Sequence, residues 1–427
     1  MSNFQRGADI PVRHSEGNGY PEYNGGLENP PSVEREKKFR QTDIGEYSTD
    51  WIVDRIDSAF EIQQGKQVSK KNRDGDHQRP FLRTKNVFWN RLELRENDLL
   101  VCEGGSIGRT ALWNNQIEGC LYQNHLHRLR AKANKVVPQF GVYWLWYAFD
   151  VAKLYFGRGN VTTIPNLSRS KLAELPISLP PLPEQKKIAH ILSTVQRAIE
   201  AQERIIQTAT ELKKALMHKL FTEGLRNEPQ KETVIGMVPE SWEVVEIGDV
   251  FKFTSGKTKP KDTAPEPSLK RTIPVYGGNG VLGYSTQRLF NEPVLILGRV
   301  GEYCGCAHLT KPISWVTDNA LFAKEVKRPV NLSYARTHFE YLNLNQYNNK
   351  MGQPLITQGI INRVLFGLPS REEQDELASA FESLDTRIDQ IKSRKRSFQE
   401  LFRTLLHELM TANTLVQHID IFSSVQL

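Results

Sequence analysis

Features that mark secreted, metal-binding or membrane proteins are scarce in this sequence. Only four cysteines occur in 427 residues, which is too few for a disulfide scaffold. Cys304-x-Cys306 has no second cysteine pair to complete a zinc site. No uninterrupted apolar run reaches the ~18 residues of a membrane span, and the polar N-terminus has no apolar signal-peptide core. We therefore expect reduced thiols at Cys102, Cys120, Cys304 and Cys306, no membrane span and a cytoplasmic location.

Acidic residues are fewer than basic ones. The chain carries 56 Lys and Arg against 49 Asp and Glu, for a net charge of +7 and a pI of about 9.0. This balance suggests an anionic partner, with nucleic acid first and an acidic protein second. A mildly basic surface without such a partner is the alternative. At 39% hydrophobic and 25% charged residues, the chain can bury the cores of several domains.

An internal repeat organises the chain. Trp51 and Gly65 align with Trp242 and Gly256 at a constant offset of 191 residues, and Lys follows Gly in both copies. Further along, an aligned pair of segments keeps nearly the same offset: Leu179-Pro180-Pro181-Leu182-Pro183-Glu184-Gln185 and Leu368-Pro369-Ser370-Arg371-Glu372-Glu373-Gln374. Because the matches keep their order, we conclude that one unit is written twice.

Each copy is predicted to be a β-rich α+β domain followed by a long helix. Short β-branched and aromatic runs alternate with Gly, Pro and Asn turns, and short helices are expected at 142–149 and 334–342. The predicted boundaries are a polar, partly disordered leader at 1–45, a first domain at 46–181, a helix at 182–223, a linker at 224–238, a second domain at 239–368, a helix at 369–412 and a tail at 413–427.

Both long helices carry apolar residues at three- and four-residue spacing. At 1.5 Å per residue each spans about 60 Å, and such a helix with charged flanks needs a helical partner. We predict an antiparallel coiled coil between the two copies; separate packing of each helix on its own domain is the alternative. The predicted stripe consists of Ile188, Leu192, Val195, Ile199, Ile206, Leu212, Leu216, Leu220, Leu377, Phe381, Leu384, Ile388, Ile391, Phe398, Leu401, Leu405 and Leu409.

Four motifs suggest chemistry that the surrounding sequence does not support. Gly256-Lys257-Thr258 lacks the earlier glycine of a P-loop, and the G-x-G-x-x-G stretch 278–283 precedes no helix that would receive a pyrophosphate. Asn29-Pro30-Pro31-Ser32 resembles a methyltransferase motif, but Ser32 replaces its aromatic residue. His125 and His127 have no further metal ligands nearby in sequence, so we interpret them as structural. The sequence therefore predicts no catalytic residue and no metal site.

The repeated architecture resembles the specificity subunits of type I restriction–modification enzymes over about residues 46–412. The resemblance rests on the Trp51 and Trp242 domain starts, the stretch 276–280 (Tyr-Gly-Gly-Asn-Gly) and the Leu-Pro and Glu-Gln helix starts. The second helix start departs from the first by losing the Pro-Pro-Leu-Pro run.

The resemblance implies two target recognition domains, each reading one half of a bipartite DNA site. It implies that the helices set the spacer and dock two modification subunits. It also implies that S-adenosylmethionine, ATP and Mg reach the complex through the modification and restriction/translocase subunits, with no cofactor in this chain.

Basic loops occupy equivalent places in the two copies and differ in sequence, which predicts an asymmetric DNA site. Lys and Arg would contact phosphates, and Asn and Gln would read base edges. The candidate DNA-binding residues are Lys66, Lys70, Lys71, Arg73, Arg83, Lys85, Arg109, Arg158, Asn160, Lys257, Lys259, Lys261, Arg271, Asn279, Arg299, Lys350 and Gln353. Two alternatives stay open: a coiled-coil scaffold with protein- or glycan-binding domains, and a self-contained DNA methyltransferase, which would need a cofactor site.

Overall fold

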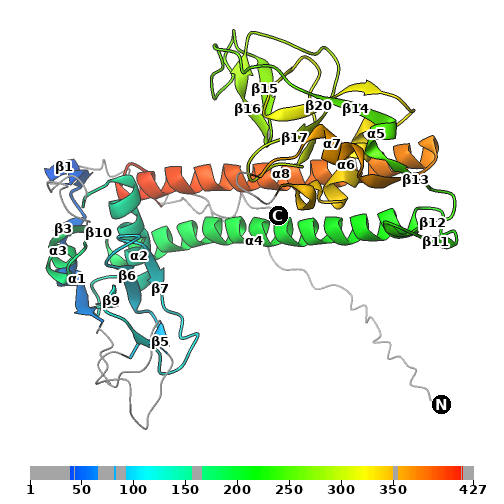
Figure 1. Cartoon of the computed structure of the whole chain (residues 1–427). Helices are drawn as coiled ribbons and strands as arrows, with labels where there is room; N and C mark the ends of the chain where they lie inside the picture. The colour runs from blue at the N-terminus through cyan, green and yellow to red at the C-terminus, as the bar shows by residue number, and fades with distance from the viewer. Residues whose placement is uncertain are drawn as a thin grey trace, which may run out of the picture.

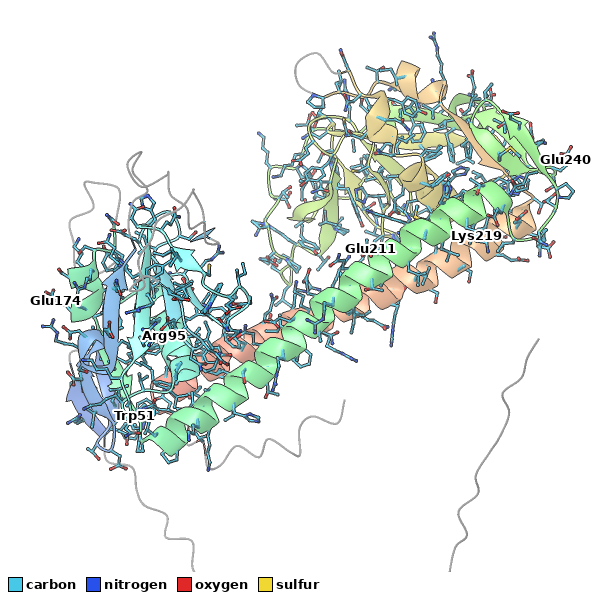
Figure 2. All side chains as sticks on the ribbon, turned by 90° about the horizontal axis from the view of Figure 1, so that it is seen from below. Trp51, Arg95, Glu174, Glu211, Lys219 and Glu240 are labelled. Atoms are coloured by element: carbon cyan, nitrogen blue, oxygen red, sulfur yellow. The ribbon has the colours of Figure 1, made fainter. Side chains whose placement is uncertain are left out.

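A computed structural model describes residues 39–42, 44–65, 81–82, 93–155, 166–349, 354–414 and 416. Two α+β domains lie at opposite ends of a pair of long helices, α4 (Leu182–Glu223) and α8 (Arg371–Met410) (Figure 1). Figure 2 shows domain 1 at the start of α4 and domain 2 beside its other end. Of the described helices, none is both long and apolar enough to cross a bilayer. The two-domain, two-helix architecture predicted from the repeat is confirmed.

The ends of α4 and α8 follow from local sequence. Pro183 lies in the first turn of α4, where its missing N–H leaves no hydrogen bond unmade, and Gly224 ends the helix with a positive φ of 69°. Ser370 caps α8 by accepting a hydrogen bond from the Glu373 N–H at 3.3 Å. The Glu373 side chain does not return to Ser370, as a capping box requires, because it contacts the second domain instead.

The two long helices run antiparallel. Ion pairs with α8 show this, since the partner's number falls as the position along the chain rises. Glu203 and Lys213 of α4 pair with Lys395 and Asp385 (2.7 Å for Lys213–Asp385), and Arg226, just after α4, pairs with Glu376 (2.8 Å). Each helix therefore begins on its own domain and ends beside the other one.

Most of the predicted apolar stripe faces inward, but two members do not. Leu212 is 61% exposed and Leu401 is 44% exposed, whereas the neighbouring Lys213 and Phe402 are buried. Both exposed leucines are one residue out of phase with the 3.6-residue helical repeat, so the side chain that reaches the seam is the next one. Including Leu212 and Leu401 in the stripe was wrong; the remaining members are buried or half-buried.

Domain 1 is built on an antiparallel sheet of four strands in the order β4-β9-β6-β7. A two-stranded parallel pair, β5 with β8, lies beside it. Its elements are β1 (Phe39–Thr42), β2 (Gly45–Ser48), β3 (Ile52–Arg55), α1 (Ile56–Ala59), β4 (Phe60–Gln64), β5 (Phe81–Leu82), β6 (Leu99–Cys102), β7 (Thr110–Leu112), β8 (Leu121–Tyr122), β9 (Leu126–Ala131), α2 (Pro138–Trp146), the π-helical turn η2 (Tyr147–Val151), α3 (Arg169–Glu174) and β10 (Pro176–Leu179).

Domain 2 repeats this plan with the antiparallel sheet β14-β20-β17-β18 and the smaller sheet β16-β15-β19. Its elements are β11 (Gln230–Thr233), β12 (Gly236–Pro239), β13 (Glu243–Glu246), α5 (Ile247–Val250), β14 (Phe251–Ser255), β15 (Ile273–Gly277), β16 (Gly280–Ser285), β17 (Leu295–Gly298), β18 (Ala307–Leu309), β19 (Trp315–Val316), β20 (Ala320–Val326), α6 (Leu332–Tyr341), the 3-10 helix η3 (Leu344–Tyr347), α7 (Gln358–Asn362) and β21 (Leu365–Leu368).

The repeat begins earlier than the sequence indicated. The hairpin β1–β2 and the hairpin β11–β12 lie at the same offset of 191 that relates Trp51 to Trp242. The predicted domain start at residue 46 falls inside β2, and the predicted linker 224–238 holds β11 and most of β12. Neither hairpin was predicted, since polar residues with little alternation form them, and the domain boundaries themselves stay predictions.

A tryptophan at the start of each domain is joined to the helix that ends it. The Trp51 indole N–H donates to Glu184 Oε2 at 3.3 Å, and the Trp242 indole N–H donates to Glu373 Oε2 at 3.1 Å. Both tryptophans are buried, and both glutamates lie in the first helical turn. The carboxylate thus receives a hydrogen bond where the helix dipole also stabilises it.

The glutamine after each glutamate holds the helix to its domain as well. Gln185 Oε1 accepts the Val137 N–H at 2.8 Å, and Gln374 Oε1 accepts the Asn331 N–H at 2.8 Å. The same amides donate to the carbonyls of Pro180 and Pro369. The repeated Glu-Gln pair is therefore a domain–helix joint, with every polar atom that it buries satisfied by a named neighbour.

Each domain core includes the far end of the other copy's helix. Phe402, Leu406 and Leu409 of α8 belong to the core of domain 1. Met217, Leu220 and Phe221 of α4 belong to the core of domain 2. Because the helix ends are built into both cores, the spacing between the domains is set by the helices.

Candidate nucleic-acid interface

A glycine opens the basic loop in each domain because two backbone segments touch there. A Cβ on Gly65 would lie 1.9 Å from the Gln123 carbonyl oxygen, and one on Gly256 would lie 2.2 Å from the Thr317 carbonyl oxygen. The Gly65 N–H also donates to Leu126 O, and the Gly256 N–H donates to Ala320 O. Only glycine permits this approach, which starts both loops at the same edge of the four-stranded sheet.

The loop of domain 2 runs along the small sheet and is fastened to it. The Lys257 N–H donates to Val316 O at 3.0 Å, and Ala264 and Tyr284 exchange two backbone hydrogen bonds of 2.9 and 2.7 Å. Lys257, Lys259 and Lys261 are exposed between these points. The three lysines are therefore held on a defined surface instead of trailing on a free loop.

Asp262 anchors the same loop. Its carboxylate accepts hydrogen bonds from the Ser285 hydroxyl at 2.7 Å and from the Thr286 N–H at 2.8 Å. The Ser285 hydrogen bond, with those of Thr286, lowers the pKa of Asp262 to about 2. This carboxylate therefore stays ionised and bound to β16. The sequence did not indicate this role, because an acidic residue among lysines carries no signal of a long-range hydrogen bond.

Arg271 lies in a tight turn at the far end of this loop. The Ser268 N–H donates to Arg271 O at 3.0 Å, and Ser268 Oγ accepts the Arg271 N–H at 3.2 Å. Lys270 and Arg271 are exposed, and Leu269, which follows Ser268, is fully exposed. Residues 256–288 hold six basic and two acidic residues, and one of the acids is the anchored Asp262. The surface over the small sheet is therefore positive.

The remaining described candidates of domain 2 lie at the other end of the small sheet. Asn279 is exposed in the β15–β16 turn, so the glycine-rich stretch forms a hairpin. Arg299 follows β17 and is half-buried, with its Nη1 donating to Ser255 Oγ at 3.2 Å. Its backbone N–H donates to Asn319 O at 2.9 Å. Arg299 is thus partly committed to the fold, whereas Asn279 is open to solvent.

In domain 1 the structure describes one of the candidates, Arg109, which is exposed in the turn between β6 and β7. The other candidates of both domains lie outside the described residues: Lys66, Lys70, Lys71, Arg73, Arg83, Lys85, Arg158, Asn160, Lys350 and Gln353. Of the two histidines, His127 is buried with Nε2 2.6 Å from Leu167 O, and His125 is exposed. His127 is therefore a structural residue, and no metal-binding cluster occurs among the described residues.

Each copy of the repeat matches the same known family. The family described as "Type I restriction modification DNA specificity domain" matches residues 48–211 and 239–397, so one match falls on each copy.

This chain belongs to the type I specificity-subunit family.

Its relatives span its whole architecture. A putative type I restriction enzyme specificity subunit, MjaX, of Methanocaldococcus jannaschii is 25% identical over 90% of this chain and 98% of its own length. The MjaVIII specificity subunit of the same organism is 24% identical over the same shares. A crystal structure of the S subunit of a type I system from M. genitalium has the same fold, with a TM-score of 0.59 and 19% identity over 84% of this chain and 96% of that one.

Membership of the family assigns the role of the chain. It is the DNA specificity subunit of a type I restriction–modification system, a non-catalytic part of that complex. The motifs that resemble nucleotide-binding sites are accordingly structural: Gly256 begins a fastened loop, and Gly278 begins a hairpin turn.

Proposed function

We propose that the positive surface over the small sheet β16-β15-β19 contacts one half of an asymmetric, bipartite DNA site, and that the equivalent surface of domain 1 contacts the other half. The observation that carries this proposal is the Gly65/Gly256 pair. The same backbone contact occurs at both glycines, and the sequences that follow Gly65 and Gly256 differ. Lys257, Lys259, Lys261 and Arg271 supply phosphate contacts, and Asn279 reads a base edge.

The test exchanges the loop 257–272 for a loop of another sequence with Gly256 and Asp262 retained. Methylome sequencing of the assembled methyltransferase should then show a change in one half-site, with the other half-site and the spacer kept. A variant with the exposed Lys252 of β14, outside the exchanged loop, changed to alanine is the matched control. Loss of both half-sites at once would contradict the assignment of one half-site to one domain.

Salt dependence separates phosphate contacts from base contacts. Lys259→Ala with Lys261→Ala should weaken binding to all DNA sequences alike and lower the salt slope by about one for each phosphate that is no longer neutralised. Asn279→Ala should weaken binding to the cognate site alone. A slope unchanged by the lysine substitutions would remove these lysines from the interface. Sequence-blind binding by the assembled complex would instead favour the scaffold alternative.

We further propose that the outer faces of α4 and α8 dock two modification subunits, which bring S-adenosylmethionine, while restriction/translocase subunits bring ATP and Mg, all in the cytoplasm. Ile205 and Leu212 support this, because they are 46% and 61% exposed and lie seven residues apart on one face of α4. Leu212→Glu should reduce co-purification of the modification subunit. Gln207→Glu, on the opposite face of the helix, is the control and should not.

A further inference from the structure

The two places where a helix end meets the opposite domain are equivalent by the internal repeat. Positions on α4 and α8 correspond at an offset of 189, as Glu184 does to Glu373. Positions on α2 and α6 correspond at an offset of 194, because Val137 and Asn331 each donate to the helix-start glutamine. With these offsets, the ring contact Tyr147–His407 (6.0 Å) maps onto Tyr341–His218 (6.2 Å). The two contacts have the same geometry.

Domain 1 contacts the end of α8 through aromatic rings. Phe402 of α8 is buried, with its ring centroid 4.9 Å from Trp146 and 6.0 Å from Tyr143. The Tyr143 hydroxyl donates to Gln196 Oε1 on α4 at 2.9 Å. We call Tyr143, Trp146 and Phe402 the aromatic dock; none of its members carries a charge.

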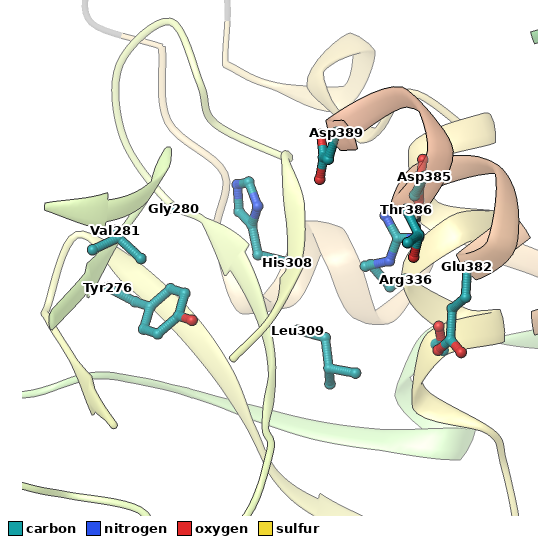
Figure 3. Close-up of a pocket in the computed structure, with 11 residues that line it drawn as sticks. Tyr276, Gly280, Val281, His308, Leu309, Arg336, Glu382, Asp385, Thr386 and Asp389 are labelled. Atoms are coloured by element: carbon teal, nitrogen blue, oxygen red, sulfur yellow. Dashed lines mark hydrogen bonds and ion pairs between the residues drawn. The ribbon is translucent and has the colours of Figure 1, made fainter. Parts of the chain in front are cut away.

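Domain 2 contacts the end of α4 through charged side chains at the equivalent positions. Lys213 takes the place of Phe402, and Glu340 takes the place of Trp146. Lys213 Nζ lies 3.0 Å from Glu340 Oε1 and 2.7 Å from Asp385 Oδ1, although the lysine side chain is only 9% exposed. Arg336 completes the group at 2.7 Å from Asp385 (Figure 3). We call Lys213, Arg336, Glu340 and Asp385 the charged dock.

Charge balance holds the charged dock together. Two cations face two carboxylates; Lys213 is buried, Arg336 and Asp385 are half-buried, and Glu340 closes the group at its solvent edge. Burial raises the pKa of Asp385, but the hydrogen bond and positive charge of Lys213, with the charge of Arg336, outweigh burial and leave that pKa below its ordinary value. Removing Lys213 alone would leave an excess of negative charge in this partly buried group.

Each helix end therefore suits only one dock. A second α4 end placed on domain 1 would bring Lys213 against Tyr143, with Trp146 in the place of Glu340 and Gln196 in the place of Asp385, so that both of its carboxylate partners are replaced by uncharged side chains. A second α8 end placed on domain 2 would bring Phe402 among Arg336, Glu340 and Asp385 with one cation missing. Both mismatches bury an uncompensated charge, which is costly.

We propose that the aromatic and charged docks sort the helix ends, so that unlike halves of the chain pair and like halves do not. The sorting keeps the two domains in one fixed, heterotypic order on the helix pair and acts against pairing between like halves of two chains. It concerns assembly of the chain and does not require that either domain reads DNA.

Four full-length variants test the sorting, with melting temperature (Tm) as the measurement. Lys213→Phe and Phe402→Lys place each helix-end residue in the wrong dock, and each should lower Tm by about 4 °C or more. Lys213→Phe with Glu340→Trp transplants the aromatic pair, and Phe402→Lys with Trp146→Glu transplants the ion pair. Each transplanted pair should recover at least half of the fall in Tm of its mismatched parent.

Lys214→Phe is the matched control, since Lys214 is the exposed neighbour of Lys213 and its replacement should leave Tm unchanged. The proposal is overturned if Lys213→Phe melts like the wild type, or if a transplanted pair is no more stable than its mismatched parent. Should Phe402→Lys fail to fold, the Lys213 series decides alone, because its substitutions lie at the interface between α4 and domain 2.

Discussion

At the scale of single residues, this protein contains a glycine and a histidine that their neighbours enclose tightly. Gly256 lies where the loop and the β19–β20 turn touch, and His338 of α6 is fully enclosed between Phe221, Trp242 and Phe366. The repeat marked the glycine, because Gly65 and Gly256 align. No sequence pattern marked His338, since its burial arises from aromatic rings distant in the chain.

Gly256→Ala should destabilise domain 2 by about 1–3 kcal/mol, because the new methyl group overlaps the Thr317 carbonyl oxygen and the backbone must move. It should also weaken DNA binding, since the loop that follows begins there. Gly359→Ala is the control: it lies in α7, and its new Cβ would come no closer than 4.0 Å to Thr357 Oγ1. Thermal unfolding and a DNA-binding titration measure both effects, and equal stability of the two variants would exclude the overlap as a cause.

His338 should make domain 2 sensitive to acid. Burial lowers its pKa to about 3, whereas an unfolded histidine titrates near pH 6.5. Between these values the unfolded chain binds a proton that the folded chain does not. The free energy of unfolding should therefore fall as the pH drops below 6.5, by about 1.4 kcal/mol per pH unit from this group, and the stability is fully present above that pH.

Urea unfolding at pH 7.5 and 5.5 measures this loss. His338→Phe should show a smaller fall in stability between the two pH values than the wild type, because it has no proton to bind. His125→Gln, at an exposed position, should keep the wild-type fall. An identical fall in all three proteins would exclude His338 as the cause.

At the scale of elements, the Glu-Gln pair at each long-helix start has a physical reason. The glutamate receives the domain's buried tryptophan, and the glutamine receives the backbone that precedes α2 or α6. Glu373 also accepts the Leu225 N–H at 2.9 Å, which ties the end of α4 to the start of α8. The motif that carried the family resemblance is thus a structural joint.

Glu373→Ala should destabilise the protein by roughly 2 kcal/mol or more, because it leaves the buried Trp242 indole N–H without this acceptor. Glu372→Ala, one residue earlier and 82% exposed, should change stability by less than about 1 kcal/mol. Chemical unfolding followed by tryptophan fluorescence compares the two variants. If Glu373→Ala lowered the free energy of unfolding no more than Glu372→Ala does, the Glu373–Trp242 hydrogen bond would not have the proposed structural role.

At the scale of the whole molecule, α4 and α8 act as a spacer between two domains. Each helix end is part of the opposite domain's core, so the helix length sets the distance between domains. In the middle of the pair, Glu203 and Lys395 join the helices to each other. A change of length made there should move the domains apart without changing either one.

Inserting seven residues after Gln202 in α4 and seven after Lys395 in α8 should lengthen the pair by about 10 Å. Two helical turns nearly preserve the rotational phase. At about 3.4 Å per base pair, the unread DNA spacer should grow by about three base pairs while both half-sites stay the same. Methylome sequencing of the assembled enzyme measures the spacer, and an unchanged spacer would contradict the prediction. Insertion into α4 alone breaks the register and is the negative control.

The repeat, the two long helices and the family were all determined by the sequence, because these depend on spacing along the chain. Over forty residues, however, the three- and four-residue spacing used for the prediction fell out of phase with the actual helix. Leu212 was therefore predicted to face the seam, where Lys213 lies instead. The placement of Asp262 against β16 and of Lys213 against Glu340 was decided only by the tertiary structure. These contacts join residues 23 and 127 positions apart, and no local pattern of side chains specifies such a pairing.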